Sequence, residues 1–222
     1  MPNNALAPLA PESDLPQKVG DAILDLVLQV PASHEHEVSQ PDAHARALGR
    51  TAARQASLVA GSLALPPGFL GWLTILPELL AVWRLQAQMV SDIAASYGKS
   101  AELGREQMLY CLFKHVSAQL FRDVVVRVGE RYLIRRTSLA FIQSTARMLG
   151  VKVTQKLIGK GVSRFVPVIG ALGVGAYAYF DTTQVAKTAI DLFSKDIARD
   201  DTPDLQAKWP ASDRAACIDS YK

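Results

Sequence analysis

Apolar residues recur along this chain at alternating spacings of three and four positions, which is the spacing of helices that bury one side. The clearest run contains Leu80, Trp83, Ala87, Val90, Ala94 and Tyr97. Positions spaced in this way lie on a single helical face. Comparable runs predict helices over residues 17–30, 43–64, 139–153 and 181–198. Strand-like runs joined by a turn are missing from the pattern, so the sequence predicts an all-α fold.

The segment from residue 100 to residue 135 is less regular. Ser100 suits a helix N-cap, with Glu102 in the first turn, so residues 100–117 are predicted to be helical. A second helix is predicted to follow and to end near Arg135. The valines at 124–126 also suit a strand, because β-branched side chains pack well on a pleated surface. The helix is the prediction for this segment, and a strand is the alternative.

Two strongly apolar blocks resemble membrane spans but fall short of one. The block at 63–82 is interrupted by three prolines and by Glu78, and Pro77 suits a helix N-terminus with Glu78 in its first turn. The block at 166–180 covers 15 residues, or roughly 22 Å of helix, against a hydrocarbon core of ~30 Å. We expect the two blocks to be buried against each other, or the second to enter a membrane as a re-entrant hairpin. The residues expected at these contacts are Pro67, Gly68, Trp72, Gly170, Gly173 and Gly175.

Basic residues gather in the middle of the chain. The formal charge is −6 over residues 1–42, +11 over 43–164 and −2 over 165–222, although the whole chain carries only +3. Within the middle part, Lys and Arg recur every four residues, and this spacing keeps each set on one side of a helix. The three sets are Arg46, Arg50 and Arg54; Arg127, Arg131 and Arg135; and Lys152, Lys156, Lys160 and Arg164. Such sets suit either a solvated helix face or an anionic membrane surface, and they contain no nucleic-acid-binding motif.

Few residues point to catalysis or metal binding. Three histidines lie among carboxylates in one polar loop, but their spacing matches no defined metal motif; they are His34, His36 and His44, beside Glu35, Glu37 and Asp42. Cys111 and His115 lie four residues apart on one helical face. Their apolar surroundings favour a buried structural cysteine over a nucleophile. We therefore expect no catalytic residue, no bound metal and no cofactor.

Several motifs resemble the EcsC family, and the likeness covers about residues 43–199. They are PPGF at 66–69, the dipeptide Pro77-Glu78, RLQAQMVSDIAASYG at 84–98, and the long block LIGKGVSRFVPVIGALGVGAYAYFDTTQVAKTAIDLF at 157–193. The family is named after a protein associated with an ABC-transporter operon. The resemblance implies a helical domain that works at a membrane, and it carries no catalytic residues to transfer.

The sequence divides into four predicted parts. These are a disordered segment at 1–16, a helix and polar loop at 17–42, an EcsC-like helical domain at 43–199 with two buried apolar segments, and a polar tail at 200–222. The start of the chain lacks the pattern of a signal peptide, and its two cysteines are isolated, which fits the cytoplasm. We expect a non-enzymatic protein associated peripherally with the inner face of the membrane, or with a membrane transport protein. The alternative is a carrier that holds a lipid or acyl chain between its helices.

Overall fold

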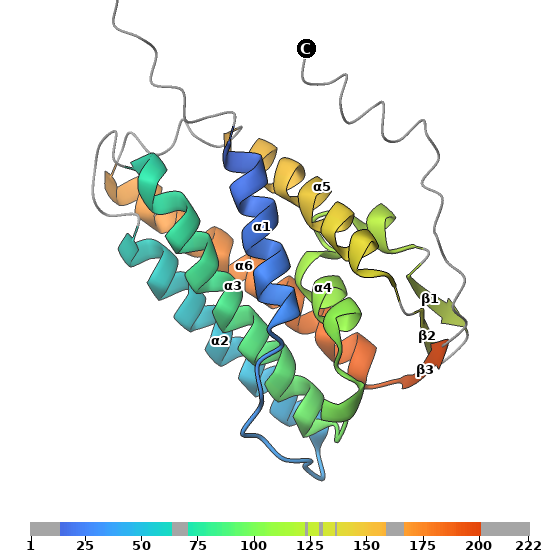
Figure 1. Ribbon diagram of the computed structural model, residues 1–222. Coiled ribbons are helices and arrows are strands. Elements are labelled where there is room, and N and C mark those ends of the chain that lie inside the picture. The colour runs from blue at the N-terminus through green and yellow to red at the C-terminus, as the bar shows by residue number, and fades with distance from the viewer. Residues whose placement is uncertain are drawn as a thin grey trace, which may run out of the picture.

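Helices carry most of the described chain, as the spacing of apolar residues predicts (Figure 1). The computed structural model describes residues 14–63, 71–122, 124–128, 131–135, 137–158 and 167–200. Its α-helices are α1 (Leu15–Leu28), α2 (Pro41–Leu63), α3 (Gly71–Ser96), α4 (Arg105–Phe113), α5 (Leu139–Ile158) and α6 (Pro167–Phe193). The other described elements are the 3-10 turns η1 (Ser100–Glu102) and η2 (Ala118–Phe121) and the strands β1 (Val125–Val128), β2 (Arg131–Arg135) and β3 (Asp196–Asp200). The predicted all-α class is confirmed, with one small sheet added at one end.

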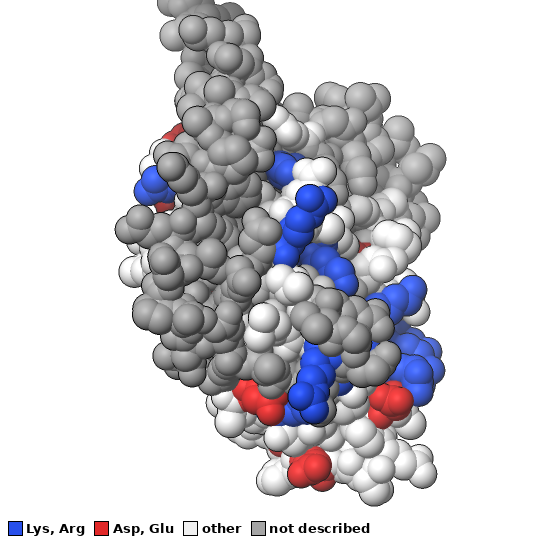
Figure 2. Space-filling view, turned by 90° about the vertical axis from the view of Figure 1, so that its right-hand side faces the viewer, with Lys and Arg blue, Asp and Glu red and all other residues white. Residues whose placement is uncertain are grey.

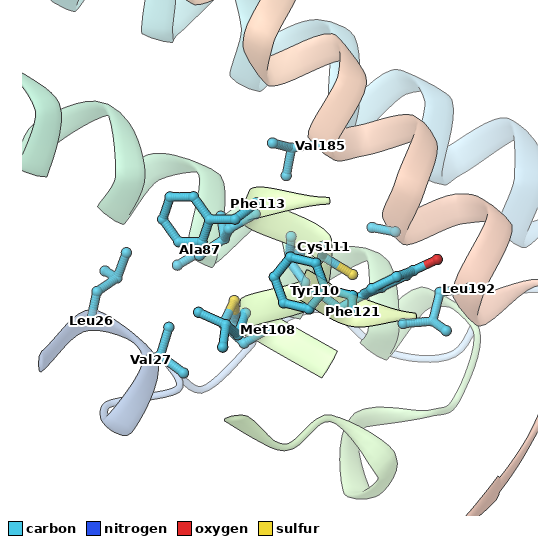
Figure 3. Packing of buried hydrophobic residues seen from close by; sticks show 14 of the residues in the cluster. Leu26, Val27, Ala87, Met108, Tyr110, Cys111, Phe113, Phe121, Val185 and Leu192 are labelled. Carbon is cyan, nitrogen blue, oxygen red and sulfur yellow. The ribbon is translucent and has the colours of Figure 1, made fainter. Parts of the chain in front are cut away.

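The long helices α2, α3 and α6 pack against one another, and α1 lies against α5 (Figure 1). Between them, α4 is buried along most of its length, so that its side chains meet those of several helices (Figure 3). Trp83 of α3 meets Phe113 of α4 edge to face, with ring centroids 5.4 Å apart. Tyr110 of α4 meets Phe121 in the same way at 5.7 Å. Aromatic pairs of this kind contribute about 0.5–1.5 kcal/mol beyond the area they bury, so they fix the short α4 at the centre of the core.

The contact between α1 and α5 depends on two glycines. A Cβ atom on Gly150 would lie 2.7 Å from the backbone nitrogen of Gly20 and 3.0 Å from its Cα. Side chains do not tolerate such short distances, so the two helix backbones approach each other as closely as glycine allows. The apolar residues that α1 buries in the core, among them Val19, Ile23 and Val27, are held in place by this contact.

The segment after α4 differs from the predicted pair of helices. α4 ends at Phe113, and η2 is followed by an antiparallel hairpin in which Val125 lies opposite Ile134. In β2 the buried residues Tyr132 and Ile134 flank a half-buried leucine, in the two-residue period of a strand. The prediction of a helix up to Arg135 was therefore wrong, and the β-branched valines form a strand instead.

A third strand is built from residues predicted to be helix and tail. α6 ends at Phe193, and β3 pairs in parallel with β2, so that Ile197 lies opposite Tyr132. The sheet order is β1-β2-β3. The predicted helix up to residue 198 is therefore too long by one turn. Local periodicity did not indicate β3, because a parallel partner more than sixty residues away forms its hydrogen bonds.

Pro77 lies inside α3 and not at a helix N-terminus as predicted, because α3 begins at Gly71. Glu78 is consequently not in a first turn; it is buried in the helix interior, with 6% of its surface exposed. A proline in a helix removes the hydrogen bond to the carbonyl four residues earlier. The helix continues through it because packing against α2 and α6 contributes more to helix stability than this local loss removes.

Candidate functional site

A row of three arginines runs along the outer side of α2. Arg46, Arg50 and Arg54 are all exposed, as their four-residue spacing predicts, and the next step of the row is Leu58, which is 73% exposed. Arg46 lies 4.0 Å from Asp42 in an exposed pair of a kind that contributes little stability. Arg50 and Arg54 form no ion pair with any described residue. No described acidic residue therefore neutralises these two guanidinium groups.

α6 lies directly beside this row. A Cβ atom on Gly49 would lie 2.8 Å from the Cβ of Ala186, and one on Gly175 would lie 3.0 Å from the carbonyl oxygen of Ser57. Position 49 thus faces 186 while position 57 faces 175, so α2 and α6 run antiparallel at close range. Arg50 follows Gly49 in the chain, and Leu58 follows Ser57. One residue turns a helix by about 100°, so the arginine row lies beside the face of α2 that contacts α6. The row therefore borders α6.

Exposed residues of α6 continue the surface. Phe180 is 61% exposed, Tyr179 is 41% exposed, and Lys187 is also exposed. α3 covers the opposite side of both helices, where Val82 packs with Ala60 of α2 and Ala178 of α6. We call the outer side the α2–α6 surface, defined by Arg46, Arg50, Arg54, Leu58, Tyr179, Phe180 and Lys187.

The α2–α6 surface changes character along its length. The antiparallel register places Lys187 level with the start of the arginine row and Phe180 level with Arg54. Leu58 lies beyond that point, in the direction of the C-terminus of α2. One end of the surface is therefore basic and the other end is apolar and aromatic. Isolated apolar residues are normal on protein surfaces, but adjacent ones beside cationic groups are typical of an interaction site.

The residues predicted for the contact between the apolar blocks have mixed outcomes. Gly175 does form a close contact, with α2, whereas Gly173 is exposed and a Cβ atom there would have open space around it. The expectation that Gly173 is a packing residue was wrong, because two residues turn a helix by about 200° and only one of the two can face α2. Pro67 and Gly68 lie outside the described residues, as do the side-chain surroundings of Trp72 and Gly170. None of the described helices has the length and apolarity needed to cross a membrane.

The other two basic sets have different outcomes. Arg127 lies in β1, while Arg131 and Arg135 lie in β2, so the prediction of one helical face was wrong. In the third set, the Lys152 Nζ atom donates a hydrogen bond to Ser117 Oγ at 2.7 Å and is half-buried. That ammonium group is directed to the protein and not to an outside partner. The rest of the set, Lys156, Lys160 and Arg164, lies outside the residues with described side chains.

A buried polar cluster that the sequence did not reveal links α3, α6 and the end of α4. Because a carboxylate only accepts, His115 Nε2 donates to Asp181 Oδ1 at 2.7 Å. Gln86 Nε2 donates to Asp181 Oδ2 at 2.9 Å and to Thr182 Oγ1 at 3.0 Å. These side chains are mostly enclosed, and the cluster joins three elements of the fold. No local pattern could indicate it, because the residues that share its hydrogen bonds are 66 or more positions apart along the chain.

Cys111 is fully buried, as expected for a structural residue. Burial raises the pKa of its thiol, and the nearby charge of Lys114 lowers it by less. The reactive form of a cysteine is the thiolate. His115 does not activate it, since that imidazole is held by Asp181. The arrangement therefore argues against the cysteine–histidine nucleophile.

A second polar cluster attaches the sheet to α6. Tyr132 of β2 donates a hydrogen bond to Asp191 Oδ2 at 2.5 Å, and Lys195 donates to Asp191 Oδ1 at 2.6 Å. Burial on its own would raise the pKa of Asp191, but the hydrogen bonds from Lys195 and Tyr132 and the charges of Lys195 and Lys114 together lower it below its ordinary value. The carboxylate therefore stays charged and fastens the sheet near neutral pH.

One of the three histidines, His44 at the start of α2, contacts a carboxylate of the preceding loop. His44 Nε2 lies 3.0 Å from Glu35 Oε2, and both side chains are partly exposed. The described residues contain no group of three or more His, Cys, Asp or Glu side chains placed to hold a metal ion.

No family model, no curated protein and no solved structure matches the chain. The resemblance to the EcsC family therefore stays a prediction, and the α2–α6 surface is interpreted from its own chemistry.

Proposed function

We propose that this protein binds peripherally to anionic membranes through the α2–α6 surface. The observation that carries the proposal is the row of three exposed arginines that continues into the exposed Leu58, with Tyr179 and Phe180 beside it on α6. Basic groups next to apolar and aromatic ones are the combination that binds at a membrane interface. Tyrosine in particular suits this zone, because its ring is apolar and its hydroxyl group reaches water.

The two ends of the surface contribute in different ways. Each Arg near an anionic leaflet contributes about 1 kcal/mol, so the row contributes about 3 kcal/mol, which falls with salt because exposed charges are screened over ~8–10 Å. Burial of Leu58 or Phe180 contributes up to about 1.5–3 kcal/mol each, and this part does not depend on salt. Together they suit a reversible surface contact.

Cosedimentation with lipid vesicles tests the proposal. The wild-type protein should pellet with vesicles that contain phosphatidylserine and much less with neutral phosphatidylcholine vesicles. Changing Arg46, Arg50 and Arg54 together to Gln should lower the partition coefficient roughly 100-fold, which is the factor that about 3 kcal/mol represents. Changing Leu58 and Phe180 to Ser should weaken binding equally at low and at high salt.

A matched control removes the same charge elsewhere. Arg84, Arg105 and Arg147 are also exposed arginines but lie on α3, α4 and α5. Changing these three to Gln should leave most of the binding intact. Equal losses in both triple variants would mean that net charge alone drives binding and would contradict the assignment of the α2–α6 surface. Binding to native membranes without dependence on lipid charge would instead support a membrane transport protein as the partner.

The carrier alternative predicts a different kind of site. A lipid or acyl carrier needs an enclosed apolar cavity. One hollow formed by described residues, between η2 and β1, is open at the surface and has Arg122 in its lining, so it is not a cavity of this kind.

A further inference from the structure

A hollow lies where η2 turns into β1. It has a volume of about 380 Å³ and is lined by Ala118, Gln119, Arg122, Val125 and Val126. This volume falls in the range of ~300–1,000 Å³ that is usual for ligand sites. The hollow is remote in sequence from the residues of the α2–α6 surface, so it needs an explanation of its own.

The lining residues indicate that the hollow follows the free edge of β1. Successive side chains of a strand point to opposite faces of the sheet, yet both Val125 and Val126 line the hollow. It therefore meets the strand along its backbone and not over one face. None of the described β2 side chains at 131–134 lines it, which places it on the side of β1 away from β2.

On that side, β1 has backbone groups to offer. In the sheet order β1-β2-β3, β1 is paired only with β2 among the described strands. Half of the N–H and C=O groups of such an edge strand point outward, and they can pair with an added strand. Buried Val125 and half-buried Val126 supply apolar contact at the same place.

The charge around the hollow favours an acidic occupant. Arg122 is exposed at its wall and forms no ion pair with a described residue. Figure 2 shows that Lys and Arg side chains cover more of the described surface than Asp and Glu side chains do on this side of the molecule, which carries α5 and the sheet. A guanidinium group binds a carboxylate through two parallel hydrogen bonds.

We propose that this hollow binds an extended peptide segment of a partner protein, which adds to β1 as a strand and places a carboxylate against Arg122. Backbone hydrogen bonds to β1 would supply affinity for any extended chain, and Arg122 would select those with an acidic residue at one position. The apolar contacts with Val125 and Val126 would favour a small aliphatic residue beside that acid.

Selection from a phage-displayed library of random seven-residue peptides, with the full-length protein as bait, tests this proposal. The enriched peptides should contain one Asp or Glu among β-branched residues and no helical pattern. The best peptide is then synthesised and titrated by fluorescence anisotropy. Arg122→Gln should weaken its binding about tenfold or more, as expected for a hydrogen bond to a charged group. Arg147→Gln removes an exposed arginine on α5 that does not line the hollow, and it should change the affinity by less than about twofold.

Hydrogen exchange locates the peptide. Bound peptide should slow exchange at the backbone amides of β1 and leave α2 unchanged. A library that yields no binder, or a peptide that binds the Arg122→Gln variant equally well, would overturn the proposal. Slow exchange of the β1 amides in the free protein would also overturn the proposal, because the edge of β1 would then already be covered. Protection that grows with protein concentration would identify a second copy as the cover, and protection that does not would identify the chain itself.

Discussion

The contact between α1 and α5 allows the sharpest test of the packing described above. In the Gly150→Ala variant, the new methyl group would lie 2.7 Å from the backbone nitrogen of Gly20 and 3.0 Å from its Cα, and still closer to the carbonyl oxygen of Pro16. All three neighbours are backbone atoms of α1, so no side chain can rotate away. The helices must separate, and with them the apolar face of α1 that holds Val19 and Ile23 in the core.

The magnitude follows from two opposing effects. Alanine is a better helix former than glycine by about 1 kcal/mol, whereas overpacking a tight contact costs about 1–3 kcal/mol and at times more. Because the clash is with backbone, we expect the upper part of that range and a net loss of about 1–2 kcal/mol, or a fall in Tm of roughly 2–8 °C for a domain of this size.

Gly173→Ala provides the matched control in α6, since nothing lies within 4 Å of the added methyl group. It should stabilise the protein by about 0.5–1 kcal/mol through helix propensity alone. Urea unfolding followed by circular dichroism measures both variants. If Gly150→Ala is as stable as Gly173→Ala, α1 and α5 are not in backbone contact and the described packing of α1 is wrong.

Two further predictions concern buried polar and sulfur groups. Cys111 should react with a thiol reagent only as the protein unfolds, because its thiol is buried and has a raised pKa. The Cys111→Ser variant should lose about 1–3 kcal/mol of stability, because it places a hydroxyl group in an apolar site. Fast labelling of Cys111 in the native protein, detected by mass spectrometry, would reopen a reactive role. Asp191 has a folded-state pKa below its unfolded value, so its contribution to stability is complete above the unfolded pKa and is lost as the pH falls through the folded one. Urea midpoints at pH 7 and near pH 3 should therefore differ less for Asp191→Asn than for the wild type, and an equal difference in both proteins would argue against the bonds from Tyr132 and Lys195.

The sequence predicted those features that depend on regular helical periodicity. Arg46, Arg50 and Arg54 are exposed on one side of α2 because that helix is long and unbroken, so four-residue spacing translates directly into position. The apolar positions Trp83, Val90 and Ala94 of α3 are buried for the same reason. The helix class of the fold follows from such segments.

Periodicity failed where the structure depends on distant partners. Arg127, Arg131 and Arg135 have the same spacing as the row in α2, but they lie in strands whose hydrogen bonds come from a hairpin and from β3. The spacing of residues also does not determine how a helix is rotated about its axis relative to its neighbour. It therefore could not show which of Gly173 and Gly175 faces α2. The apolar residues of the α2–α6 surface were missed as a group, because Leu58 and Phe180 come to the same surface only when α2 and α6 pack antiparallel.

The central claim is that the α2–α6 surface contacts the membrane, and the depth of a probe on that surface tests it most directly. A polarity-sensitive fluorophore is attached at Leu58→Cys in a Cys217→Ser background, with buried Cys111 left in place, and at Arg147→Cys on α5 as the control. With vesicles containing phosphatidylserine, the account predicts a blue shift and quenching by brominated acyl chains at position 58, and no change at position 147. A response at position 147 equal to or greater than that at position 58, with the labelled proteins bound to the vesicles, would contradict it.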